Sequence, residues 1–311
     1  MNDVKKFDAL LDEYFKQTLA ARPVWANHLG IRAAEGQLGE PSLKAIRDDE
    51  KRRQQLLTDM DQLAPSALSA EQHLDRLAVR AMVLAECEDF DRGIHRLNPN
   101  AVDHVFGALL HELQRGEDEP TRARRNVRAL LEQTPKHLRQ AARLVDRPER
   151  VWRRVMDQTA TGAGALFEAV SSFMGDDARR LIAVAQKAVV QYHAQVMSRP
   201  LAAKNSFALG ANRLQRRVHD ELGLDYTLGQ VEALALSEAD RIGGLLAKAC
   251  AKHGRGQSAE SIIEKARSEW KPEGDLLEVY RKETNRVASG FRQARAVSFP
   301  KGDELQVRLV P

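Results

Sequence analysis

The residues with the clearest potential for metal chemistry lie in the stretch His111-Glu112-Leu-Gln-Arg115. A zincin helix needs a second histidine four residues after the first, so that both imidazoles meet one ion. Arg115 occupies that position. His104 shares a helix face with His111, but two turns separate the two side chains by roughly 10 Å, whereas two nitrogens on one zinc lie within about 4 Å of each other. The sequence therefore predicts no metal site here, only two partly exposed helix histidines.

Other catalytic patterns are also absent from the sequence. Ser171, Ser172 and Ser289 lie in no nucleophile elbow, and the glycines of "TGAGALF" complete no phosphate-binding loop. We therefore assign no catalytic residue, no metal ligand and no cofactor to this chain.

A basic stripe covers residues 122–154, which contain eleven lysines and arginines and only three acidic residues. Arg124, Arg128 and Arg139 are its candidate anion contacts. Trp152 is the only aromatic residue in the stripe, so bases would have little to stack on. We favour a solvated helix surface whose arginines pair with acidic residues elsewhere, and we expect no nucleic-acid partner.

The elements that position these residues are predicted to be helices. Charged residues form 30% of the 311 residues and aromatic residues 5%, and the net charge is only +4. Apolar residues recur at helical spacing from Val4 to Leu19. Ser42 is a candidate N-cap for a helix ending near Leu63, and Ser69 begins a capping box for a helix reaching about Leu97. Breaks are then predicted at Gly116–Pro120 and at seven further points: Thr134-Pro135, Arg147-Pro148, Gly175-Asp176, Arg199-Pro200, Gly223, His253–Gln257 and Lys271-Pro272. The predicted fold is all-α, an irregular multi-helix array without a fixed repeat.

The last fifteen residues, "VSFPKGDELQVRLVP", differ from the rest of the chain. Leu305, Val307 and Leu309 alternate with polar residues, which predicts a short C-terminal β-strand or hairpin. We accordingly predict a helical domain over 1–296, as one body or two closely packed lobes, and the start of a β element over 297–311. An unpaired strand edge would favour self-association.

The cellular setting follows from two further observations. Cys87 and Cys250 are far apart and belong to no Cys/His group, which favours reduced thiols. The opening stretch "MNDVKKFDALLDEYF" contains no apolar run long enough for a signal sequence or a membrane span. We expect a cytoplasmic location and no membrane partner.

Several stretches follow one another in a recognisable order. They begin with "YFKQTLAARPVWANHLGI" and continue through "HRLNPNAVDHVFGALLHEL", "ARRNVRALLEQTPKHLRQAARLV" and "FALGANRLQRRVHDELGLDYTLGQVEALALSEADRI" to "FPKGDELQVRLVP". Together they resemble one bacterial family, the domain of unknown function numbered 885, over nearly the whole chain. Trp25, Asn27 and His28 match the family's opening motif without a known role, and a tryptophan beside a helix-ending turn is expected to be buried in the core.

The resemblance implies a longer protein. Full-length relatives are roughly twice this long and carry a zinc-binding HE-x-x-PGH-like stretch and an EGWA-like segment, the basis for relating them to zincin-like metallopeptidases. Neither stretch occurs here. The chain thus resembles the N-terminal helical half of such a protein, as a truncated piece or a short paralogue. Its expected role is a wall of the cleft for a peptide substrate, not catalytic alone, with zinc only in a full-length relative.

Two alternatives remain open. The chain could be a stand-alone helical binding or scaffold protein, or it could bind a polyanion through residues 122–154. The resemblance favours the metallopeptidase-related hypothesis, whereas the local charge alone would favour the polyanion.

Overall fold

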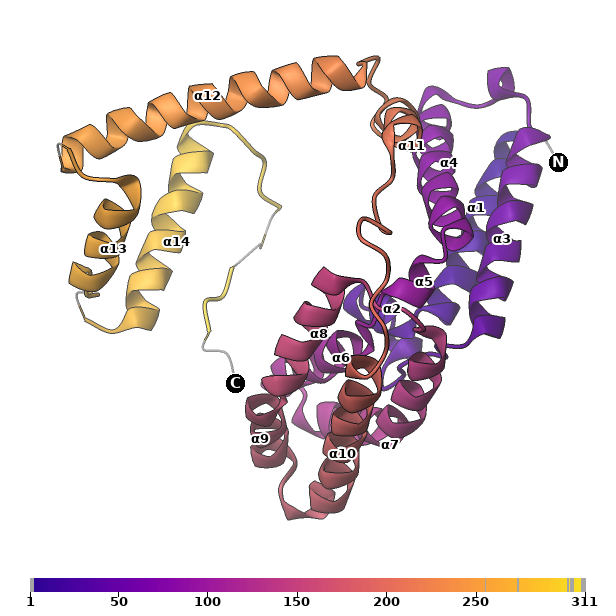
Figure 1. The fold of residues 1–311 in the computed structure, drawn as a ribbon, viewed down its shortest axis with the longest axis horizontal. Helices are drawn as coiled ribbons and strands as arrows, with labels where there is room; N and C mark the ends of the chain where they lie inside the picture. The colour runs from indigo at the N-terminus through magenta and orange to yellow at the C-terminus, as the bar shows by residue number, and fades with distance from the viewer. Residues whose placement is uncertain (1–2, 255, 273, 301, 303–304, 309–311) are drawn as a thin grey trace. The chain divides into compact units, whose positions relative to one another are not determined.

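A computed structural model describes residues 3–254, 256–272, 274–300, 302 and 305–308. Its chain forms two compact units, Met1–Tyr226 and Thr227–Pro311. All the regular elements in the described ranges are helices (Figure 1), so the all-α prediction is correct.

The first unit contains the helices that position the candidate site. They are α1 (Asp3–Ala21), α2 (Pro23–His28), η1 (Arg32–Ala34), α3 (Leu43–Asp61), η2 (Pro65–Ala67), α4 (Ala70–Asp91), α5 (Ile94–Leu97), α6 (Ala101–Arg115), α7 (Pro120–Leu144), α8 (Arg150–Thr161), α9 (Ala163–Met174), η3 (Asp176–Ala178), α10 (Arg179–Met197), α11 (Ala211–Arg216) and the π-helical turn η4 (Arg217–Glu221).

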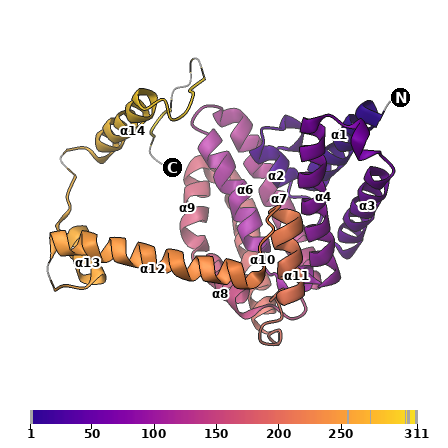
Figure 2. The same ribbon diagram turned by 90° about the horizontal axis from the view of Figure 1, so that it is seen from above.

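The larger core of this unit forms around α7, which packs against both α6 and α10 (Figure 2). Its centre includes Leu109 of α6, Leu130 of α7 and Val189 of α10, all buried, and Phe167 of α9 closes one side. These positions follow the 3,4 spacing of amphipathic helices, and burial of each such side chain contributes roughly 1.5–3 kcal/mol. The helices α6, α7 and α10 are therefore held together by buried apolar side chains.

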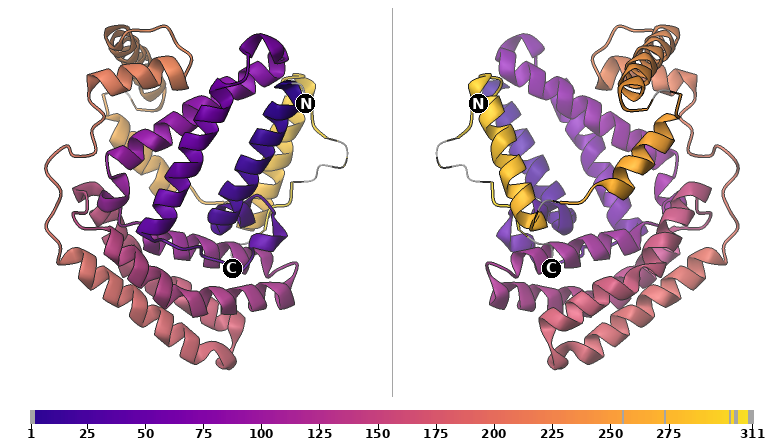
Figure 3. Two further views of the ribbon diagram at one scale, coloured as in Figure 1. Left: turned by 90° about the vertical axis from the view of Figure 1, so that its right-hand side faces the viewer. Right: turned by 90° about the vertical axis from the view of Figure 1, so that its left-hand side faces the viewer.

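A second core joins α1, α3 and α4, which run alongside one another (Figure 3). Phe7, Met60 and Val83 are buried at its centre. The predicted start signals of α3 and α4 are confirmed. Ser42 Oγ accepts the Ala45 amide at 3.1 Å, and Ser69 forms both bonds of a capping box with Gln72.

The predicted helix boundaries are wrong at two places. The helix expected to reach Leu97 ends at Asp91, because Gly93 adopts a left-handed φ of +66° and starts the short α5. The break predicted at Thr134-Pro135 is absent, and Pro135 lies inside α7. Pro135 has no N–H to donate to the Leu131 carbonyl, and neighbouring side chains add bonds of their own, since Thr134 Oγ1 donates to the Leu130 carbonyl at 2.8 Å and Gln133 Nε2 to that of Ala129 at 2.8 Å. The packing of α7 against both α6 and α10 therefore outweighs the helix-breaking tendency of Pro135.

The predicted C-terminal β-strand is also wrong. Residues 305–308 are described and have no regular secondary structure, and Leu305 is 77% exposed. Leu309 lies outside the described residues. Alternation of apolar and polar residues forms a strand only beside a hydrogen-bonding partner, and none of the described segments lies beside 305–308 as a strand. The strand edge that suggested self-association is therefore not formed in the described part of the chain.

The second unit contains α12 (Leu228–His253), α13 (Ala259–Glu269) and α14 (Leu276–Gln293). α13 lies against α12 (Figure 2). Thr227 begins α12 with a capping box, so local signals define the helix start. None of the described residues in these three helices is buried, and apolar side chains such as Leu236, Ile242 and Tyr280 are more than half exposed. The described residues of this unit form no buried core.

The turn that follows η1 depends on Gly39, which allows a direct test. Gly39 has a φ of +76°, and a Cβ there would lie 3.0 Å from Cδ of Pro23, whereas Gly30 has a φ of +82° with nothing within 4 Å of its Cβ position. We expect Gly30→Ala to cost about 1 kcal/mol through backbone strain alone. Gly39→Ala should cost about 1 kcal/mol more, because the proline ring cannot move away easily. Urea denaturation of both variants measures the difference in their free energies of unfolding. Equal losses of stability would show that the turn at Gly39 shifts to accommodate the new Cβ.

Candidate functional site

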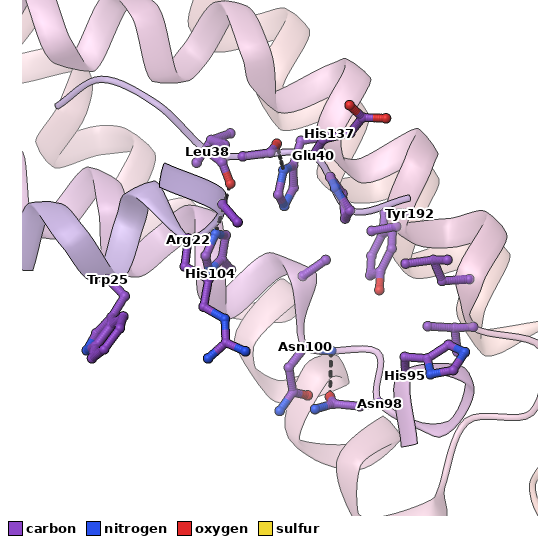
Figure 4. A pocket seen from close by; sticks show the side chains of 17 residues that line it. Arg22, Trp25, Leu38, Glu40, His95, Asn98, Asn100, His104, His137 and Tyr192 are labelled. Atoms are coloured by element: carbon purple, nitrogen blue, oxygen red, sulfur yellow. Dashed lines mark hydrogen bonds between the residues drawn. The ribbon is translucent and has the colours of Figure 1, made fainter. Parts of the chain in front are cut away.

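A pocket of about 410 Å³ opens within the first unit, between α2, the 38–41 turn, α6, α7 and α10 (Figure 4). Such a volume is typical of small-molecule sites. Its polar and aromatic lining side chains include Trp25, His95, Asn100, His104, His137 and Tyr192.

Two stacked histidines form one wall of this pocket. His104 of α6 and His137 of α7 have ring centroids 5.3 Å apart and planes only 8° from parallel. One nitrogen of each ring contacts a backbone carbonyl of the 38–41 turn: His104 Nε2 lies 3.1 Å from the Leu38 oxygen, and His137 Nδ1 lies 3.3 Å from the Gly39 oxygen. The α6–α7 packing and this turn together fix both rings.

Both rings are neutral near pH 7. Burial lowers the pKa of His137 to about 4, with a further decrease from the adjacent His104. Burial also lowers the pKa of His104. A protonated imidazole would lose its hydration here without gaining a carboxylate, which explains the direction of both shifts.

The opposite wall contains Tyr192 and the segment before α6. Tyr192 Oη donates to the Pro99 carbonyl at 2.7 Å, and burial raises the pKa of this phenol. The Asn100 backbone N–H donates to Asn98 Oδ1 at 3.0 Å. Asn100 Oδ1 is buried but has no hydrogen-bond partner in the structure. Among the described residues, Arg76 Nε and Ser206 Oγ are likewise buried without a partner, although buried polar atoms are nearly always paired.

The charge of Arg22 at the pocket rim is already balanced. Its guanidinium donates to both oxygens of Glu86, at 2.9 and 3.0 Å. Arg53 donates to the same carboxylate at 2.6 Å and to Glu50 at 3.3 Å. Two cations thus face two carboxylates, and Arg22 is poorly placed to attract an anion.

The motif residues Trp25, Asn27 and His28 fall in three different environments. Trp25 is 42% exposed and lines the pocket, so the expectation that it belongs to the core is wrong. α2 has only six residues, and its buried face is occupied by Val24, Ala26 and Asn27. His28 is exposed, and its ring packs against that of His111 with centroids 4.4 Å apart and planes tilted by 34°.

Asn27 belongs to a buried charge network centred on Glu112, whose side chain is fully buried. Glu112 Oε1 accepts from Asn27 Nδ2 at 2.8 Å and from the Arg115 guanidinium at 2.8 Å, and Oε2 accepts from Asn126 at 3.0 Å. Arg115 also donates to Asn27 Oδ1 at 3.0 Å. The network joins α2, α6 and α7, and three hydrogen bonds pair both oxygens of the carboxylate, so we assign it a structural role.

Glu35 extends this network. It pairs with Arg122 through both carboxylate oxygens, and Asn126 donates to it at 3.2 Å. The Arg122 guanidinium holds the pKa of Glu35 below its usual range. Arg122 of the basic stripe therefore stabilises the fold through its ion pair with Glu35.

The candidate anion contacts all lie on the exposed side of α7. Arg124 donates to the Phe173 carbonyl at 3.1 Å and lies over the Phe173 ring. Arg128 and Arg139 are exposed. The structure brings none of the three to the pocket, whose lining contains a single arginine, Arg22.

Among the described residues, no group of three or more His, Cys, Asp and Glu side chains could hold a metal ion. His104 and His111 belong to separate ring pairs. In the described ranges, no helix has the length and apolar character needed to cross a membrane. Cys87 and Cys250 are both free.

Sequence analysis missed His137, Asn100 and Tyr192 as pocket residues. The Asn98-Pro99-Asn100 step marked a turn, but no sequence signal paired it with Tyr192, which is more than ninety residues later. The stacking of His104 on His137 depends on how α6 packs against α7.

These observations define the class of protein: an irregular array of helices with a pocket that two stacked histidines line. The chain belongs to the family described as bacterial protein of unknown function (DUF885), whose model matches residues 23–311. A comparison with curated proteins found no match. A solved structure of a putative lipoprotein of unknown function from Shewanella oneidensis has a similar fold, with a TM-score of 0.63 and 15% identity. The alignment covers 95% of this chain and 59% of that one, so the present chain spans less than two thirds of its length.

Proposed function

We propose that this chain is the N-terminal helical part of a longer, zincin-like metallopeptidase-related protein, in which it forms a wall of a peptide-binding cleft and is not catalytic alone. The observation that carries the proposal is the alignment, which covers 95% of this chain but only 59% of its structural neighbour. Membership of the family over 23–311 agrees with it. We further propose a cytoplasmic location.

Two features of the fold support a role as a wall. The pocket between α2, α6, α7 and α10 is open and lined by both apolar and hydrogen-bonding side chains, as peptide subsites are. The described helices of the second unit expose apolar side chains that a further segment could cover.

The described residues do not fit a zinc ion. His104 and His137 would supply two imidazoles, but no third ligand completes a group with them in the described ranges. We therefore derive no catalytic step from this chain.

A peptide-hydrolysis assay tests this proposal. With zinc added, the 311-residue protein should not cleave a quenched fluorescent peptide mixture. The same protein extended by the segment that follows residue 311 in its gene should cleave it and should bind zinc. Zinc-dependent cleavage by the 311-residue protein would contradict the proposal, as would an extended protein that binds no zinc.

A stand-alone helical binding protein is the second candidate, favoured by the pocket of ligand size within the first unit. A gene that stops after codon 311, together with tight capture of a small ligand, would favour this function.

A further inference from the structure

We propose, independently of the proposed function, that the exposed face of α7 and an arginine-lined pocket at its C-terminal end bind an acidic polypeptide segment. The evidence is a set of positive charges that the fold leaves without partners, and the chemistry of the surface around them.

The exposed face of α7 carries a row of cations. Arg125, Arg128, Lys136, Arg139 and Arg143 follow one another at steps of three, four or eight residues, a spacing that places side chains on one face of a helix. All five are exposed. At the rise of an α-helix, this cationic row extends about 27 Å along the surface.

The fold leaves the cationic row unpaired. None of its five members forms an ion pair or a side-chain hydrogen bond with any described residue. Arg122 of the same helix pairs with Glu35 and Glu119 instead. The pairing with acidic residues elsewhere that we expected from the sequence therefore holds for Arg122 but not for the cationic row.

The neighbouring helices supply little compensating charge. Glu132 is the only carboxylate in α7, and α10 contains no Asp or Glu. α6 contributes Asp103 and Glu112, and Glu112 is buried in its own network. Like charges three or four residues apart on a helix repel one another. Carboxylates from a partner would relieve this repulsion along the row.

The arginine-lined pocket lies where the cationic row ends. It has a volume of about 650 Å³ and lies between the first turn of α3, the C-terminal end of α4, α5 and the C-terminal end of α7. Arg143 of the row lines it together with Arg47 of α3 and Arg96 of α5. Ser42 and Gln140 add neutral hydrogen-bonding groups to the lining. The cationic surface therefore continues from α7 into a concave site.

The arginines of this pocket exceed its available carboxylates. Arg96 pairs with Asp146, and the other acidic lining residue, Asp91, is exposed. Arg47 has no ion-pair partner in the described ranges. Burial lowers the pKa of His95, and the charges of Arg96 and Arg47 lower it further, against an opposing effect of Asp146. Arg47 and Arg96 thus both lie close enough to His95 to act on the same wall of the pocket.

The surface chemistry favours an acidic polypeptide among anionic partners. Four of the five cations in the row are arginines, whose planar fork binds a carboxylate through two parallel hydrogen bonds. All residues of α7 are described, and none of its exposed side chains is a large apolar group of the kind that anchors a helix in a membrane surface. The helix also has no Phe, Tyr or Trp on which bases could stack.

The length of the row sets the size of the partner. An extended segment of about eight residues spans it, and every second side chain of that segment, about 7 Å apart, faces α7. Repeated Asp or Glu at those positions would meet the arginines in turn. A straight row suits such a segment better than the wound phosphate backbone of a nucleic-acid duplex.

Fluorescence anisotropy at about 0.15 M salt tests the proposal. A labelled peptide of alternating Glu and Ser should bind saturably, whereas the same peptide with Gln in place of Glu should not, because it carries no charge. A labelled DNA duplex and phosphatidylserine vesicles are the competing anionic partners. Absence of saturable binding of the Glu peptide, or tighter binding of the duplex or the vesicles, would overturn the proposal.

Variants locate the site on α7. The combined change Arg128→Gln, Arg139→Gln and Arg143→Gln should weaken binding of the Glu peptide about tenfold, because three carboxylates lose their partners. The matched control changes three exposed cations elsewhere to Gln, lowers the net charge equally and should leave the affinity within about twofold; these cations are Arg32, Lys51 and Arg267. Equal effects of the two triple variants would show that only net charge matters, and the proposal would fail.

Two single variants complete the test. Glu132→Gln removes the only carboxylate of α7 and should tighten binding about twofold, a gain that misfolding cannot produce. Arg47→Gln should weaken binding about threefold if a carboxylate enters the pocket, and an unchanged affinity would contradict that part of the proposal. Circular dichroism checks that each variant is folded. Because no cleavage is measured, failure here is distinct from failure of the metallopeptidase-related proposal.

Discussion

Replacing Glu112 with alanine is expected to destabilise the first unit by about 3 kcal/mol, the lower end of the cost of breaking a buried ion pair. The carboxylate is fully buried and accepts from Asn27, Arg115 and Asn126. Its removal leaves two amides and a guanidinium without their main partner. The expected cost is at the lower end because Arg115 keeps Glu35 at 3.5 Å.

Urea denaturation at pH 7 measures this effect, with two comparison variants. Glu112→Gln keeps the shape of the side chain but loses its charge, and should fall between Glu112→Ala and the unmodified protein. Glu132→Ala removes an exposed carboxylate from α7 and should change the free energy of unfolding by at most about 0.5 kcal/mol. Equal stabilities of Glu112→Ala and Glu132→Ala would show that the network does not hold α2, α6 and α7 together.

The protein is expected to lose about 2 kcal/mol of stability through His137 when the pH falls from 7 to 4.5. The pKa of this histidine is lowered from 6.5 to about 4 in the folded state, mainly by burial. Between these two values the unfolded chain binds more protons than the folded one, so stability rises with pH. The contribution is fully present above about pH 6.5 and is lost as the pH falls toward 4. The lowered pKa of His104 acts in the same direction.

The variant His137→Gln isolates this contribution, because other groups also titrate in acid. Its free energy of unfolding, measured by urea denaturation at both pH values, should depend less on pH than that of the unmodified protein by the stated amount. His73→Gln, which replaces an exposed histidine of α4, is the matched comparison variant. Parallel pH profiles for the unmodified protein and His137→Gln would show that His137 titrates normally.

Local signals were sufficient for the helical class and for several helix starts. Ser42, Ser69 and the breaks around Pro120, Pro148 and Pro200 were predicted from the chain alone, because capping and the loss of a backbone donor act within one helical turn. Local signals were insufficient where tertiary packing opposes them. Pro135 remains inside α7 because α6 and α10 bury that helix, and residues 305–308 form no strand because no paired partner lies beside them.

The sequence by itself determined that the protein is helical, that its histidines have no zincin spacing, and that its weak motifs follow the order of one bacterial family. Only the tertiary structure decided that Glu112 is the centre of a buried network, that Trp25 is exposed, and that His104, His137 and Asn100 share a pocket. The physical reason is distance along the chain. Capping, periodicity and proline act on neighbouring residues, whereas burial, pKa shifts and acceptor clusters depend on which helices pack together.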